Sequence, residues 1–190
     1  MLPYDSPDAD LASAAARGDR AALEALLHRH ADRVHAICRR VLINPDDSLD
    51  ATQEALLAVS RGIERFDGRS QFTTWLYRVA TNAALDEARR RRRRPIPTET
   101  LPEPPVKGAG TADLVADRLD VDAALSSIPA DFRAAVALRD LAGLDYAEIS
   151  ETLGIPPGTV RSRIARGRAA LAATIGNRGP DSERPTDQSP

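Results

Sequence analysis

The stretch LDYAEISETLGIPPGTVRSRIARGRAAL, Leu144–Leu171, restricts the fold more than any other part of the chain. Asp145 precedes Glu148 by three residues, which is the spacing of a capping box, so a helix is predicted to begin there. Gly154 is expected to end that helix, because glycine readily closes helices in the left-handed conformation. A second helix is predicted from about Gly158 to Ala173. Two helices joined by so short a turn form a helix-turn-helix.

The second of these helices carries side chains that suit DNA. In a helix-turn-helix, the second helix enters the major groove, where residues near its start meet base edges and arginines further along meet phosphates. No acid lies between Arg161 and Arg168, and arginine can bind guanine in bidentate fashion. An ordinary helical hairpin with a solvated basic face is the alternative. The predicted DNA contacts are Thr159, Arg161, Ser162, Arg163 and Arg166.

The first half of the chain also shows helical periodicity. Alanine and leucine dominate, aromatic residues make up only 4%, and Val, Ile and Phe never form alternating runs, so an all-α protein is expected. Helices are predicted over 20–42, over about 49–63 with Leu49, Leu56 and Ile63 buried, and from Phe72 into the arginine run before Pro95. Trp75 shares an apolar stripe with Phe72, which favours core packing over base stacking.

The longest interruption of this helical pattern is the proline-rich, acidic stretch PIPTETLPEPPVKGAGTAD. We expect two small helical domains, at 10–95 and 118–176, joined by a flexible acidic linker at 96–117 and followed by a disordered tail at 177–190.

Positive charge is clustered although the formal net charge is −2. Six consecutive arginines, Arg89–Arg94, form one basic block and the second predicted helix of the helix-turn-helix carries another. Each helical residue turns by about 100°, so the six encircle the axis and only two or three can face one DNA backbone. Arginines at a helix C-terminus also complement its dipole, and both roles can hold together.

Three blocks of the chain resemble the extracytoplasmic-function (ECF) sigma factors of bacterial RNA polymerase, in the order of that family. FDGRSQFTTWLYRVATNAALDEARRRRRRP resembles sigma region 2 around the promoter-melting segment, and DSLDATQEALLAVSRGIERF resembles the core-polymerase-binding helix before it. IPADFRAAVALRDLAGLDYAEISETLGIPPGTVRSRIARGRAAL resembles sigma region 4. The resemblance covers about Leu11 to Ile175. It implies a factor that directs RNA polymerase core to specific promoters, with no catalytic activity and no cofactor of its own.

The resemblance also implies roles for particular residues. Region 2 of the family reads the −10 element and holds a flipped base of the non-template strand, and Asn82 matches a position that helps to hold it. The expected −10 contacts are Asp67, Gly68, Arg69, Ser70, Arg78, Asn82, Arg89 and Arg90. Region 4, with its helix-turn-helix, is expected to read the −35 element.

Partners follow from the same resemblance. Asp50, Gln53, Glu54 and Leu57 form a polar stripe with a leucine at helical spacing, which suits docking on another helix. In the family, this surface binds the clamp coiled coil of RNA polymerase, and region 4 binds the flap. The further expected partners are promoter DNA and a cognate anti-sigma factor.

Other classes of protein are less well supported. The single cysteine, Cys38, cannot form a disulfide within the chain, and no apolar run is long enough to span a bilayer, so we expect a cytoplasmic protein without direct membrane contact. His28, His30, His35 and Cys38 are too badly spaced for one metal ion. A stand-alone helix-turn-helix regulator, or a sigma-like interaction protein of the anti-sigma pathway, remains an alternative.

Overall fold

The structure is a computed structural model that describes residues 6–93, 125–126 and 128–176. The first half contains α1 (Asp8–Ala16), α2 (Arg20–Leu42), α3 (Pro45–Gly62), a 3₁₀ turn (Ile63–Arg65) and α4 (Phe72–Arg93). The second half contains α6 (Ala130–Asp140), α7 (Tyr146–Leu153) and α8 (Pro157–Gly176). No strand occurs in these residues, so the all-α prediction is confirmed. The predicted linker at 96–117 and tail at 177–190 lie outside the described residues.

Local side chains set the helix boundaries. The Asp19 carboxylate accepts hydrogen bonds from the backbone of Ala21 and Ala22 at 3.0 and 3.1 Å, and so begins α2. Ile43 has a positive φ of 67°, which a helix cannot continue through, so α2 ends there and the chain turns into α3. The capping box predicted at Asp145 and Glu148 is present at the start of α7.

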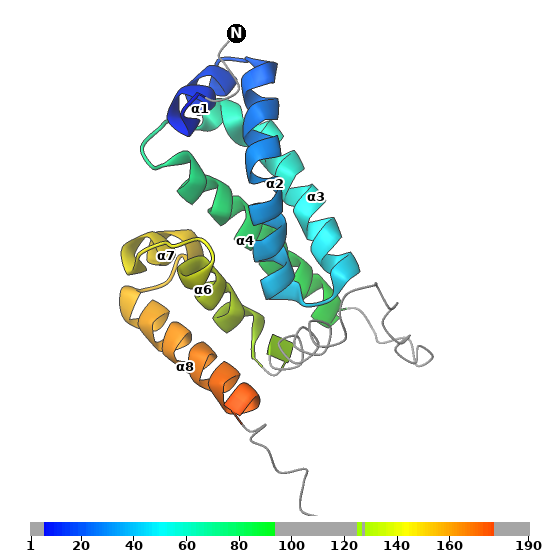
Figure 1. Ribbon diagram of the computed structural model, residues 1–190, viewed down its shortest axis with the longest axis vertical. Helices are drawn as coiled ribbons and strands as arrows, with labels where there is room; N and C mark the ends of the chain where they lie inside the picture. The colour runs from blue at the N-terminus through cyan, green and yellow to red at the C-terminus, as the bar shows by residue number, and fades with distance from the viewer. Residues whose placement is uncertain (1–5, 94–124, 127, 177–190) are drawn as a thin grey trace, which may run out of the picture.

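Small residues let the first four helices pack closely. In α3 the fully buried positions include Ala51 and Ala55, and in α4 they include Ala80 and Ala84. Figure 1 shows α2, α3 and α4 side by side, and alanines at these buried positions allow their backbones to pack closely. Trp75 packs against this core beside Phe72, with ring centroids 5.9 Å apart.

One predicted buried position in α3 is wrong. Leu49 is 50% exposed, whereas its neighbour Ser48 is fully buried. The hydroxyl of Ser48 donates to the Pro45 carbonyl at 2.7 Å, so its burial leaves no polar group unsatisfied. The inner face of α3 is therefore lined by small side chains, and the helix is rotated so that its larger leucine faces outward.

The N-terminal helix α1 has no counterpart among the helices predicted from the sequence. Its Leu11 is fully buried against the bundle. Asp8 anchors it to α2, through Arg29 at 2.5 Å and the ring nitrogen Nε2 of His30 at 2.7 Å. These contacts join α1 to residues more than twenty positions away.

The helix-turn-helix packs on α6 through a glycine. A Cβ atom added at Gly167 of α8 would lie 2.7 Å from Cγ2 of Val136, closer than side chains tolerate. Val160 and Ile164 of the same helix are buried beside it. Because these three residues fix the inner face of α8, they also determine which residues face solvent.

The two halves of the molecule are in contact in this structure. The half-buried Arg133 of α6 donates through Nε to the carbonyl of Val41 in α2 at 2.7 Å, and its Nη1 donates to the carbonyls of Leu125 and Ile128. Burial lowers the pKa of the Arg133 guanidinium. A second contact joins Thr74 of α4 to Glu148 of α7 at 3.1 Å. Figure 1 shows α6 and α7 lying alongside α4.

None of the described helices is both long and apolar enough to cross a membrane.

Candidate nucleic-acid and protein interfaces

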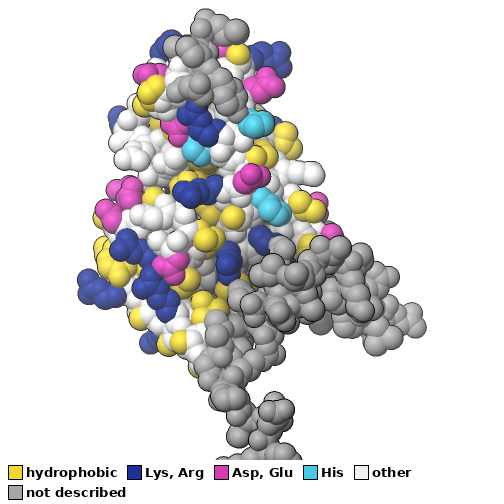
Figure 2. Space-filling model, viewed as in Figure 1, with side chains coloured by type: hydrophobic (Ala, Val, Ile, Leu, Met, Phe, Trp, Pro, Cys, Tyr) yellow, Lys and Arg dark blue, Asp and Glu magenta, His cyan; other side chains and the backbone are white. Residues whose placement is uncertain are grey.

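The helix-turn-helix presents its polar residues to solvent as the sequence predicts. Arg161, Ser162 and Arg166 are exposed on α8, while Thr159 and Arg163 are half-buried. The Ser162 hydroxyl donates to the carbonyl of Thr159 at 3.0 Å. Figure 2 shows basic side chains gathered over the part of the surface where Figure 1 places α7 and α8. These residues are accessible to a DNA groove, and their individual contacts with DNA stay predictions.

The arginines of α8 differ in whether they are paired with an acid, and the sequence pattern does not predict this difference. Arg168 forms an ion pair and hydrogen bonds with Asp140 of α6, and this carboxylate raises the pKa of Arg168. Arg163 lies 4.0 Å from Asp131, also on α6. Although α8 has no acidic residue between Arg161 and Arg168, α6 supplies the acids that pair with two of its arginines. Within the described ranges, neither Arg161 nor Arg166 forms an ion pair.

Arg161 has an aromatic neighbour instead of an acid. Its guanidinium carbon lies 5.9 Å from the centre of the Tyr146 ring, over the ring face. The guanidinium of Arg139, from the last turn of α6, lies 5.2 Å from the same centre. Both distances are within the range of a cation–π interaction. Tyr146 is the first residue of α7, so this cluster joins three helices.

The expected −10 surface is also exposed. Arg78, Asn82, Arg89 and Arg90 lie on the solvent side of α4, away from the buried Ala80 and Ala84. Asn82 and Arg89 are seven residues apart and therefore share one face. The preceding residues Asp67, Gly68, Arg69 and Ser70 are all exposed, and Asp67 accepts a hydrogen bond from the Arg69 backbone at 3.1 Å.

Aromatic side chains pack at both ends of the loop Asp67–Ser70. Phe66, before the loop, meets Phe72, after it, edge to face at 5.9 Å. Phe66 also lies 5.5 Å from Trp75, and Phe72 lies 5.7 Å from His30 on α2. Both ends of the loop are thus fixed on packed rings, which leaves its polar middle exposed.

The arginine run is partly neutralised by the protein itself. Arg89 pairs with Asp86 and Arg90 pairs with Glu87, each at 2.8 Å. Arg91 pairs with Asp47 at the start of α3. Arg94, the last of the run, lies outside the described residues. Of these pairs only Arg89–Asp86 is exposed on both sides, because Glu87 is buried and Asp47 is half-buried. That two or three of these arginines face DNA stays a prediction.

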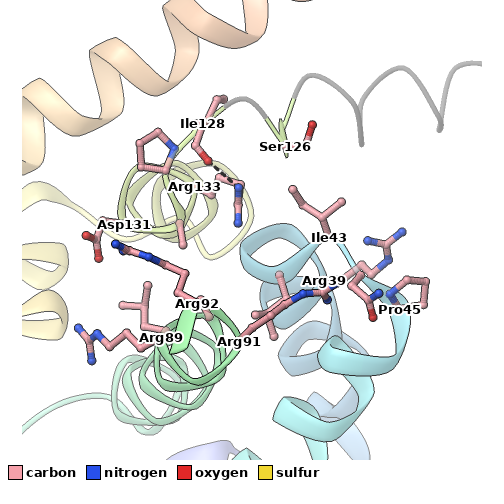
Figure 3. Close-up of a pocket in the computed structure, with 16 residues that line it drawn as sticks. Arg39, Ile43, Pro45, Arg89, Arg91, Arg92, Ser126, Ile128, Asp131 and Arg133 are labelled. Atoms are coloured by element: carbon pink, nitrogen blue, oxygen red, sulfur yellow. Dashed lines mark hydrogen bonds between the residues drawn. The ribbon is translucent and has the colours of Figure 1, made fainter. Parts of the chain in front are cut away.

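A groove of about 1140 Å³ lies where the two halves meet (Figure 3). Arg89, Arg91 and Arg92 of α4 line it from one side, and Arg39 of α2 and Arg133 of α6 line it from others. Asp131 is the one acid among the described residues that line it. The charged groups that line the groove are therefore mostly basic.

The stripe predicted on α3 lies on the surface. Asp50, Gln53 and Glu54 are exposed, and Leu57 is 47% exposed. The structure adds Leu49, which the sequence analysis assigned to the core. Leu49, Gln53 and Leu57 are four residues apart in turn and form one ridge along the helix. The helical phase of the buried Ser48, Ala51 and Ala55 is the signal that could have identified Leu49.

The histidines and the cysteine serve structural contacts. His30 binds Asp8, and a ring nitrogen of His35 lies 3.2 Å from the Thr52 hydroxyl. Burial raises the pKa of the Cys38 thiol to about 11, so it stays protonated at neutral pH. In the part of the chain that the structure describes, no group of His, Cys, Asp or Glu is arranged to hold a metal ion.

Comparisons with known proteins agree with this arrangement. The family model for Sigma-70 region 2 matches residues 26–94, and that for Sigma-70, region 4, matches residues 118–171. ECF RNA polymerase sigma factor SigE of Mycolicibacterium smegmatis is 44% identical over 166 residues, which cover 82% of this chain and 63% of SigE. ECF RNA polymerase sigma factor SigM of Mycobacterium tuberculosis is 36% identical over 173 residues, which cover 91% of this chain and 87% of SigM.

Solved structures share the fold. CnrH, in complex with the cytosolic domain of CnrY, superposes with a TM-score of 0.69 at 25% identity, over 90% of this chain and 99% of CnrH. The sigma factor RpoE, in complex with the anti-sigma factor NepR from Bartonella quintana, superposes with a TM-score of 0.65 at 22% identity, over 82% of this chain and 98% of RpoE.

Proposed function

Because this chain belongs to the ECF sigma factors, we propose that it docks on RNA polymerase core through α3 and reads promoters with α4 and α8. Sigma factors are initiation factors and not enzymes, so the polymerase supplies the chemistry. The observation that carries the proposal is that one chain exposes two separate polar surfaces of the kind that DNA contacts require. These are the helix-turn-helix with Arg161 and Arg166, and the α4 face with Asn82.

The −35 element is the expected target of α8. Its first turns hold Arg161 and Ser162 at the surface, where a recognition helix meets base edges. Arg166, one turn further on, is placed for a phosphate or a second base. Arg168 is held by Asp140 and therefore contributes less.

The −10 element is the expected target of α4 and the loop before it. Taking a base out of the stack costs a few kcal/mol, which contacts with the extruded base must recover. Asn82 can hydrogen-bond a base edge, and the exposed loop Asp67–Ser70 provides further polar groups beside it.

Core polymerase is the expected partner of α3. Its ridge offers two exposed leucines, Leu49 and Leu57, flanked by Asp50 and Glu54. A helical partner with apolar and basic residues, such as the clamp coiled coil, complements this surface. The flap is the expected partner of the second half.

The packed arrangement of the two halves corresponds to a closed state. The −10 and −35 elements are separated by about 25 base pairs, which is about 85 Å of B-DNA at 3.4 Å per pair. In the structure, α7 touches α4 through Thr74 and Glu148. The halves must therefore move apart before both DNA-reading helices engage one promoter.

A cognate anti-sigma factor is the expected regulator. If it stabilises the closed state, it prevents α4 and α8 from engaging the −10 and −35 elements of one promoter at the same time. The solved complex of the sigma factor RpoE with the anti-sigma factor NepR supports an anti-sigma partner, since RpoE shares this fold over 82% of this chain. Isolating the partner from the native host and titrating it into a transcription reaction tests the idea. Unchanged transcription would reject it.

Replacing Asn82 by alanine tests the −10 assignment. We expect open complexes to fall by about 5- to 150-fold, since a base-edge contact is worth about 1–3 kcal/mol. Permanganate reactivity of unpaired thymines, on a promoter recovered by transcription of genomic fragments with core polymerase, measures the melting.

The matched control is Asp86→Ala. Asp86 is exposed one turn further along the same face, and it pairs with Arg89 at 2.8 Å. Removing this acid frees Arg89, so promoter melting is expected to be unchanged or stronger. If Asn82→Ala melts the promoter as well as the unmodified protein does, α4 does not hold the base through Asn82.

A further inference from the structure

Tyr146 presents an aromatic ring at the surface of the helix-turn-helix. The residue is 38% exposed, which is unusual for a large hydrophobic side chain in this molecule. Among the described residues, its ring lies against two guanidinium groups, those of Arg139 and Arg161. Because this ring is partly exposed and contacts two guanidinium groups, core packing alone does not explain why an aromatic residue occupies this position.

Arg139 is the fixed member of this cluster. It is half-buried, and its Nη1 donates to the carbonyl of Leu144 at 2.8 Å, in the turn before α7. Its guanidinium therefore has a defined position, 5.2 Å from the centre of the Tyr146 ring. The capping box at Asp145 fixes the backbone of Tyr146 from the other direction. The backbone of Tyr146 and the guanidinium of Arg139 beside its ring are thus fixed by α6 and by the turn before α7, and Arg168 of α8 also interacts electrostatically with Tyr146.

Arg161 is the movable member. It is exposed on the outer face of α8, where the neighbouring Val160 and Ile164 point inward. Without an acid partner in the described residues, its long side chain has only the Tyr146 ring, 5.9 Å away, to restrict it. A side chain that is ordered before binding loses less conformational freedom when it binds.

We propose that Tyr146 is a positioning residue that holds the Arg161 guanidinium ready to read a base of the −35 element. This inference rests on the proposed role of α8 as the −35 reader. A guanidinium stacks through its flat face and donates hydrogen bonds from its edge. Arg161 can therefore keep its contact with the ring while its edge binds guanine in bidentate fashion.

The proposal predicts a change in sequence discrimination and not in general affinity. Phosphate contacts supply most of the non-specific binding and its salt dependence, and Tyr146 carries no charge that would alter them. Loss of the ring should reduce the preference for the intact −35 element by about two- to fivefold, the range of an exposed cation–π contact. The salt dependence of binding should stay the same.

The test uses the full chain assembled with core polymerase. Binding is measured on a mapped promoter duplex and on the same duplex with its −35 element scrambled, and the ratio of affinities is the readout. The variants are Tyr146→Leu, Tyr146→Phe, Arg161→Ala and the double variant Tyr146→Leu with Arg161→Ala. Tyr146→Phe keeps the ring and should keep the ratio, whereas Tyr146→Leu should lower it. In the background of Arg161→Ala, Tyr146→Leu should have no further effect.

Each contrary outcome is distinct. If Arg161→Ala leaves the ratio unchanged, α8 does not read the −35 element through Arg161, and both the proposed role and this inference fail. If Arg161→Ala lowers the ratio but Tyr146→Leu does not, only the inference fails. If Tyr146→Phe lowers the ratio as much as Tyr146→Leu, the hydroxyl and not the ring is responsible, which overturns the inference. Equal effects of Tyr146→Leu with and without Arg161 would also overturn it.

Discussion

Replacing Asp50, Gln53, Glu54 and Leu57 together by alanine is expected to abolish stable binding to bacterial core RNA polymerase. All four side chains are exposed on one face of α3, so the substitutions remove surface groups and leave the core packing intact. A few central residues carry most of an interface's binding energy, at about 2 kcal/mol or more each. The affinity should therefore fall by at least about a hundredfold. Co-elution on a sizing column, followed by titration with labelled core, measures it.

A variant with three alanines elsewhere provides the control. Asp10, Glu24 and Asp32 are exposed acids on α1 and α2, and replacing them changes the net charge more than the α3 variant does. This control should bind core polymerase normally. If the α3 variant co-elutes as the unmodified chain does, while remaining helical by circular dichroism, α3 is not the docking surface.

Replacing Arg161 and Arg166 together by alanine is expected to remove most recognition of the −35 element. A well-placed arginine that binds a base is worth about 1–3 kcal/mol, so removing Arg161, together with the phosphate or base contact of Arg166, should weaken −35-dependent promoter binding by at least about fivefold. Both side chains are exposed on α8 and form no ion pair within the described ranges, so the fold should be unaffected. Competition between intact and scrambled −35 duplexes, with core polymerase present, measures the effect.

Arg168→Ala is the matched control for this variant. Arg168 lies on the same helix but is bound to Asp140 of α6. Its removal should change −35 recognition little. A loss of recognition as large as that of the double variant would mean that α8 binds DNA through its total charge and not through particular side chains.

Sequence reasoning succeeded where the signals are local. The ends of α2, the capping box at Asp145 and Glu148, and the left-handed Gly154 all depend on neighbouring residues, and the structure contains each of them. The four predicted residues of the α3 stripe are exposed together because their helical spacing alone places them on one face. Their partner remains a prediction.

Sequence reasoning failed where distant residues decide the outcome. Leu49 looked like a core residue, but close packing of α3 through Ala51 and Ala55 rotates it outward. The arginines of α8 looked unpaired, but α6 supplies Asp131 and Asp140. The local sequence pattern predicts neither of these two ion pairs, because the partners are far apart in the sequence and meet only after folding.

The contact between the two halves is a further feature that the sequence does not predict. Arg133 lies on α6 without a motif around it, yet it donates to the Val41 carbonyl of α2 across the boundary. A half-buried guanidinium that donates to backbone carbonyls of both halves depends on the relative placement of the two halves. Local periodicity carries no information about that placement.

The central claim is that this chain directs core polymerase to promoters, and transcription of fragmented genomic DNA from the native host tests it most directly. Core polymerase is incubated with and without the chain, and the 5′ ends of the transcripts are sequenced. We expect start sites that depend on the chain and share one pair of upstream elements at fixed spacing. If the chain adds no start sites, while an established sigma factor activates the same core on the same DNA, the claim is contradicted.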